Sequence, residues 1–144
     1  MKRLLSIFIL VFLVSLLIGC SGGNGIIPPP SQEVEKFVGL WVNEKPIGPG
    51  INITKCEINL VGKKLTIDMW VKISGTNENY LGQKMVDSKE AEDGVIEITW
   101  FDDLGVTQDK LSLVNNKLKI QSTFTPYNPD WNTGITIDYL IKTI

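Results

Sequence analysis

Hydrophobic and polar residues alternate along most of the chain after Phe37, with turn-forming residues at short intervals. Strict alternation predicts half-buried β-strands, and strands separated by short polar turns predict an all-β domain. The third strand is the clearest, because every second residue from Leu65 to Ile73 is apolar. The pattern predicts eight strands, at about residues 38–43, 51–60, 64–74, 83–88, 95–101, 106–114, 117–125 and 135–143.

The predicted strands have one apolar face and one polar face, as expected for an antiparallel sheet with one side in water. The apolar faces of three later strands consist of Ile96, Ile98 and Trp100; of Leu118, Ile120, Ser122 and Phe124; and of Ile135, Ile137, Tyr139 and Ile141. In the eighth strand this assignment leaves Thr136, Asp138 and Lys142 on the solvent face. Ahead of the strands, residues 33–37 could form one turn of helix.

The connections predict sequential hairpins. Asn115-Asn116 is a two-residue connection whose residues tolerate positive φ, and Gly62-Lys63 is another short polar turn. Eight sequential strands can bury their apolar faces and remove their exposed edges by closing into a barrel. We therefore expect an eight-stranded antiparallel up-and-down barrel; a two-sheet β-sandwich is the alternative.

The connections also alternate in length. In an up-and-down barrel, every second connection emerges at the same end, so one end carries residues 44–50, 75–82, 102–105 and 126–134. The other end carries residues 61–63, 89–94 and 115–116, which are mostly shorter. The asymmetry predicts an open mouth built from long loops and a closed base built from tight turns.

The N-terminal residues 1–19 have the pattern of a targeting segment. Lys2 and Arg3 precede an uncharged run from Leu4 to Ile18, which is short for a permanent membrane-spanning helix and typical of a signal peptide. Residues 20–36 then begin with a cysteine and continue as a Gly- and Pro-rich tether. The barrel domain is predicted to occupy residues 37–144.

The end of the targeting segment, Leu17-Ile18-Gly19-Cys20, resembles the lipobox of bacterial lipoproteins. This resemblance implies a diacylglycerol thioether on Cys20, cleavage before it, and acylation of the new amino terminus. Two or three acyl chains are enough for stable membrane anchoring. We expect a lipid-anchored protein of the cell envelope; Ser21, rather than aspartate, after the anchor favours the outer membrane in a cell with two membranes.

Composition excludes several kinds of function. Without the first 19 residues the chain keeps 12 lysines, no arginine and 16 acidic residues, a poor surface for nucleic acid. The chain contains no histidine, the usual general base near neutral pH and the commonest metal ligand. Cys56 occupies an apolar strand position and is expected to be buried and inert. We therefore expect no enzymatic activity, no catalytic residues, no metal and no cofactor.

Residues 37–41, with the sequence FVGLW, resemble the Gly-x-Trp signature in the first strand of lipocalins and the wider calycin group. Through about residue 73, the chain is similar to small bacterial lipocalin-like domains of unassigned function. The resemblance implies an eight-stranded barrel and no established reaction. Trp41 would plug the barrel base, with ligand contact as the alternative. In lipocalins a late arginine packs over this tryptophan; here Lys142 is the nearby candidate.

Three aromatic residues are predicted to lie in loops at the mouth. Tyr127 and Trp131 occupy the last long loop, and Tyr80 occupies the segment 75–82. Exposed aromatic side chains on loops leave large apolar surfaces available for a partner. The leading hypothesis is a barrel that binds a small apolar or amphipathic ligand, or a protein loop, at this rim. The alternative is a solid-core barrel acting as a structural or inhibitory protein-binding module in the envelope.

Overall fold

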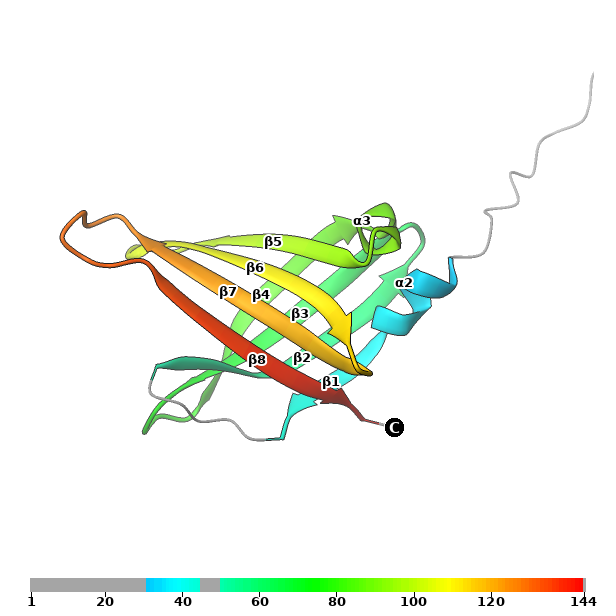
Figure 1. The fold of residues 1–144 in the computed structure, drawn as a ribbon, viewed down its shortest axis with the longest axis horizontal. Helices are drawn as coiled ribbons and strands as arrows, with labels where there is room; N and C mark the ends of the chain where they lie inside the picture. The colour runs from blue at the N-terminus through cyan, green and yellow to red at the C-terminus, as the bar shows by residue number, and fades with distance from the viewer. Residues whose placement is uncertain (1–30, 45–49, 144) are drawn as a thin grey trace, which may run out of the picture.

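The computed structural model describes residues 31–44 and 50–143. Its eight strands form one antiparallel sheet that curls into a nearly closed up-and-down barrel, so the predicted fold class is confirmed and the sandwich alternative is wrong (Figure 1). The strands are β1 (Gly39–Asn43), β2 (Ile51–Val61), β3 (Lys64–Ile73), β4 (Glu78–Asp87), β5 (Val95–Phe101), β6 (Gly105–Val114), β7 (Lys117–Pro126) and β8 (Gly134–Lys142). The predicted signal peptide, Cys20 and most of the predicted tether lie outside the described residues.

The first and last strands, β1 and β8, pair with each other, and the ring of strands is open between β4 and β5. β1 pairs with both β2 and β8, and the sheet order runs from β4 through β1 and β8 to β5. β4 and β5, the two ends of this order, are not hydrogen-bonded neighbours. The expectation of a fully closed ring is therefore wrong at one seam.

Two short helices cover the base of the barrel (Figure 1). Helix α2 (Gln32–Phe37) begins after Ser31, whose side-chain oxygen accepts a hydrogen bond from the backbone N–H of Val34. Helix α3 (Ser88–Glu92) connects β4 to β5 and packs against α2. No described helix has the length and apolar character to cross a membrane. Since Val34 belongs to the core, the folded unit begins before residue 37.

The tight turns lie at the helix-covered end, as predicted. Asn115 and Asn116 have φ angles of 50° and 61°, which suits a two-residue hairpin turn between twisted strands. At the opposite end, the β7–β8 connection of residues 127–133 projects beyond the other hairpins (Figure 1). β4 begins at Glu78 rather than at residue 83, so the β3–β4 connection is shorter than predicted.

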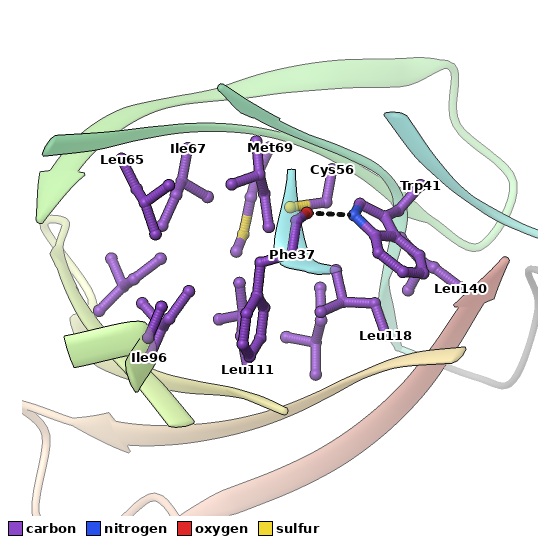
Figure 2. Close-up of a cluster of buried hydrophobic side chains, with 14 of the residues drawn as sticks. Phe37, Trp41, Cys56, Leu65, Ile67, Met69, Ile96, Leu111, Leu118 and Leu140 are labelled. Atoms are coloured by element: carbon purple, nitrogen blue, oxygen red, sulfur yellow. Dashed lines mark hydrogen bonds between the residues drawn. The ribbon is translucent and has the colours of Figure 1, made fainter. Parts of the chain in front are cut away.

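The barrel interior is a packed apolar core. Figure 2 shows side chains from opposite walls of the barrel pointing into the space that the strands enclose. Phe37, at the end of α2, lies near the centre of this space. Nine large aliphatic or methionine side chains have no solvent-exposed surface: Ile58, Leu65, Ile67, Met69, Ile96, Leu111, Leu118, Ile120 and Leu140. The predicted inward faces of β3, β5 and β7 agree with this core.

The predicted faces of β8 are inverted in the structure. Asp138 pairs directly with the fully buried Ile120 and is itself buried, and Leu140 is also inside. Ile137 and Tyr139 instead face outward, with exposed fractions of 49% and 48%. The isoleucine-rich face of this strand therefore lies on the outer surface, and the expectation that it lines the core is wrong.

Candidate functional site at the barrel mouth

Four large apolar side chains are exposed at the tips of two neighbouring hairpins at the mouth. The β5–β6 hairpin carries Phe101 and Leu104, which are 71% and 56% exposed. The β7–β8 connection carries Tyr127 and Trp131, which are 59% and 53% exposed. We call these four residues the mouth cluster. Large apolar side chains exposed on neighbouring turns are candidates for an interaction site.

Hydrogen bonds stabilise the conformation of the β5–β6 turn and of the β7–β8 connection. The carboxylate Oδ1 of Asp102 accepts hydrogen bonds from the backbone N–H groups of Leu104 and Gly105, at 2.7 and 2.8 Å. Asn128 accepts hydrogen bonds from the backbone N–H groups of Asp130 and Trp131. Polar side chains that bond to the backbone two residues on are typical of stable turns.

A further backbone hydrogen bond joins the two hairpins. The N–H of Tyr127 donates to the carbonyl oxygen of Leu104 at 2.9 Å. The backbone that presents the mouth cluster is therefore pre-organised, which lowers the entropic cost of binding.

Tyr80 does not belong to this site. It lies within β4 rather than in a loop, and it pairs with Trp70 on the outer wall of the barrel. The two rings are 5.1 Å apart, and Lys55 Nζ lies 3.5 Å from the Trp70 ring centroid. The Tyr80 hydroxyl donates a hydrogen bond to Asp68, which raises the pKa of Tyr80. The prediction that Tyr80 lines the rim is wrong, because β4 extends five residues further toward the mouth than its alternation indicated.

The barrel interior contains two buried carboxyl groups that the alternation pattern did not place there. Asp109, on β6, is 1% exposed, and its Oδ2 accepts a 2.7 Å hydrogen bond from Trp100 Nε1. Burial raises the pKa of Asp109; the polar groups of Ser122 and Trp100 partly offset this effect, and the charge of Asp138 adds to it. Because Asp109 lies two residues from Leu111 on the same strand, counting along β6 could have identified its inward position.

Asp138 joins β8 to β2 beyond the point where β1 ends. Its Oδ2 accepts a 3.1 Å hydrogen bond from the backbone N–H of Ile53, and its Oδ1 accepts one from Asn43 Nδ2 at 3.0 Å. Asn43 Nδ2 also donates to the Ile53 carbonyl oxygen. Burial raises the pKa of Asp138, and these two hydrogen bonds oppose that shift. The carboxyl group thus replaces strand pairing at a gap in the sheet.

The packing of the core limits where a ligand could bind. Side chains that line a ligand-sized void retain free surface inside it, whereas nine core side chains retain none. In the part of the barrel that the structure describes, the deep interior is filled by the protein's own side chains. A ligand or partner would therefore contact the mouth or the outer surface.

The remaining predicted site residues lie away from the mouth cluster. Trp41 is at the base, 2% exposed, and its Nε1 donates a 2.8 Å hydrogen bond to the Phe37 carbonyl oxygen (Figure 2). Cys20 is outside residues 31–44 and 50–143. Within those ranges, no group of three or more His, Cys, Asp or Glu side chains is arranged to hold a metal ion.

Sequence reasoning identified Tyr127 and Trp131 as mouth residues and missed Phe101 and Leu104. The alternation pattern places Phe101 at the end of the strand 95–101 and Leu104 in the connection 102–105, and neither position by itself indicates exposure. Two apolar residues flanking the polar pair Asp102-Asp103 were the available signal.

Comparisons of the chain with protein-family models, with curated proteins and with solved structures gave no match.

Proposed function

We propose that this protein is a lipid-anchored binding protein of the cell envelope that docks on a partner protein through the mouth cluster. The observation that carries the proposal is the exposure of Phe101, Leu104, Tyr127 and Trp131 on hydrogen-bonded turns. Aromatic side chains are enriched among the residues that contribute most to protein–protein binding. The filled interior favours this solid-core hypothesis over a barrel that encloses a small ligand.

The anchor is the second part of the proposal. The lipobox-like sequence at Cys20 and the Gly- and Pro-rich segment after it support attachment by acyl chains with the domain held away from the lipid. The protein then acts by binding, as an inhibitor or structural module, rather than by catalysis.

Site-specific photo-crosslinking in intact cells tests the proposal. A photoreactive amino acid at position 131 is expected to give a discrete adduct with one envelope protein. The matched control is position 85, because Met85 is apolar, 57% exposed and on the outer face of β4. Tyr127→Ser should weaken the adduct at position 131 without changing the folded fraction. Identical adduct patterns from positions 131 and 85 would contradict docking through the mouth.

A small apolar or amphipathic ligand at the mouth is the second candidate. Ser122 and Phe124 pair with Thr136 and Gly134 on the inward faces of β7 and β8, and both are only partly buried. A shallow site could form above the packed core there. Titrating intrinsic tryptophan fluorescence with a panel of lipids and hydrophobic dyes, against Trp131→Ala as control, distinguishes this candidate. A saturable change with the purified protein alone would favour the small ligand over a protein partner.

A further inference from the structure

The outer face of β8 carries a stripe of large apolar side chains. Ile135, Ile137 and Tyr139 are 63%, 49% and 48% exposed, and Ile141 follows on the same face. The stripe continues onto β1, where Leu40 is 36% exposed and Val42 pairs with Ile141. We call these six residues the β8 stripe. It runs along the barrel wall from the mouth toward the base.

The orientation of β8 is explained by a hydrogen bond on its inner face and not by its outer face. Asp138 must face inward to bond the Ile53 N–H, so its neighbours Ile137 and Tyr139 must face outward. Polar residues at those two positions would also leave Asp138 facing inward and would avoid an exposed apolar surface. Contiguous exposed apolar surface of this kind marks interaction with a membrane or a protein.

The residues beside the stripe favour a lipid surface over a protein. Lys117 and Lys119 on β7 pair directly with Ile141 and Tyr139 of the stripe. The other outward residues of β7 along the stripe are the uncharged Gln121 and Thr123, which pair with Ile137 and Ile135. Along the stripe, the outer faces of β7 and β8 therefore combine apolar, basic and uncharged polar groups and contain no carboxylate. On the β1 side, Leu40 pairs with Glu57 and Val42 with Lys55, and Lys117 Nζ lies 3.9 Å from Glu44 Oε2, so β7 carries the basic edge of the stripe. Apolar side chains insert at the acyl boundary of a membrane, tyrosine favours its interface, and lysines attract anionic headgroups.

The position of the stripe also suits the proposed anchor. Helix α2 begins at the base, the end at which β8 finishes (Figure 1). The segment from Cys20 to Ser31 can span at most roughly 40 Å, at about 3.5 Å per residue. A barrel lying on its side needs its base within this reach of the membrane surface, which the segment permits.

We infer that the β8 stripe and its flanking lysines lie against an anionic lipid surface, so that the barrel rests on its side. This orientation goes beyond the proposed function and uses its lipid anchor only to bring the stripe near the membrane. It leaves the mouth cluster facing along the membrane plane. The wall around β4, four strands from β8 in the strand order, faces away from the lipid.

An environment-sensitive fluorophore on a single introduced cysteine tests the orientation. The full mature chain is reconstituted in vesicles of phosphatidylglycerol and phosphatidylcholine, with the label on Ile137→Cys or, as the matched control, on Met85→Cys. Cys56 is fully buried and does not compete for the label in the folded protein. We expect a blue shift and quenching by nitroxide-labelled lipids at position 137 and neither at position 85.

Charge and anchor variants separate the contributions. Lys117→Gln/Lys119→Gln should weaken binding of an unlipidated Cys20→Ser chain to anionic vesicles by more than about tenfold, because each lysine near the surface adds to the attraction. In this unlipidated chain the contrast between labels at positions 137 and 85 should persist at high lipid concentration. If the full mature chain does not attach to membranes but the contrast between positions 137 and 85 remains, the proposed lipid anchor is wrong and the contact of the stripe with lipid is supported.

Three results would overturn the inference. Equal emission at positions 137 and 85 in vesicles would show that the stripe does not meet lipid. Equal binding to vesicles of pure phosphatidylcholine would remove the role of the lysines. A blue shift at position 137 that appears without vesicles and grows with protein concentration would assign the stripe to contact with a second copy. Thermal unfolding of each variant, with a midpoint near that of the unmodified chain, checks that the fold is retained.

Discussion

The ammonium group of Lys142 lies 5.3 Å from the centroid of the Trp41 ring at the base of the barrel. Lys142 Nζ also donates a hydrogen bond to the Lys36 carbonyl oxygen, which ties the end of β8 to α2. The lysine thus lies over the tryptophan of the Gly-x-Trp sequence, where the lipocalin resemblance implied an arginine. Gly39 completes this arrangement, because a Cβ at that position would lie 2.5 Å from Lys142 Cε.

Gly39→Ala is expected to destabilise the barrel. Gly39 has a φ of +139°, which side-chain-bearing residues rarely adopt, and such strain costs about 1–3 kcal/mol. The free energy of unfolding in urea measures the effect. In a Lys142→Ala background the steric part disappears, so the loss should be smaller there; a fully additive double variant would contradict close packing of Lys142 over Gly39.

Asp109 should make the stability of the protein fall as the pH rises. Burial raises its native pKa above the ordinary 3.8, so the native state keeps the proton to a higher pH than the unfolded chain. The contribution of Asp109 to the free energy of unfolding is fully present below pH 3.8 and is lost as the pH rises through the native pKa of Asp109. Asp109→Asn should flatten this part of the stability profile, measured by urea unfolding from acid to neutral pH. The same slope in Asp109→Asn would contradict the assignment, and Asp130→Asn in the mouth loop serves as the control for loss of one charge.

Cys56 is expected to react with thiol reagents only when the protein unfolds. Its side chain has no exposed surface, and burial raises the pKa of the thiol, so the reactive thiolate is scarce in the native state. The labelling rate without denaturant should be far below that of a surface thiol introduced as Met85→Cys. Rapid labelling of Cys56 in the native protein would mean that the core opens locally.

The orientation of β8 can be tested with two lysine substitutions. Ile137→Lys should change the free energy of unfolding of the lipid-free protein by no more than about 0.5 kcal/mol, because residue 137 lies on the outer surface of the barrel. Leu140→Lys should destabilise the fold by more than about 4 kcal/mol, because it buries an unpaired charge. Thermal unfolding compares the two variants. Comparable losses would mean that Ile137 contributes to the core.

The mouth cluster should matter for binding and not for folding. Trp131→Ala removes a half-exposed side chain, so the free energy of unfolding should change by no more than about 0.5 kcal/mol. Loss of an aromatic side chain at the centre of an interface commonly costs about 2 kcal/mol or more of binding free energy. Affinity for the crosslinked partner, measured by calorimetry, should fall by more than about tenfold. Phe101→Ala provides the same comparison from the neighbouring hairpin.

Local sequence determined the number of strands, the tight turns and the all-β class, because alternation and turn propensity depend on neighbouring residues. Asn115 and Asn116 illustrate this, because both tolerate the positive φ that the two-residue turn between β6 and β7 requires. The buried position of Cys56 and the mouth position of Trp131 follow from the same local pattern.

Only the tertiary structure decided which face of β8 points inward. Alternation divides a strand into two faces, but the register with β7 and the early end of β1 select between them. Asp138 lies inside because the Ile53 N–H has no strand partner there and needs an acceptor. The same long-range closure left β4 and β5 unpaired, moved Tyr80 to the outer wall and exposed the β8 stripe. These features depend on contacts between residues far apart in the chain, which a local pattern of hydrophobic and polar positions does not contain.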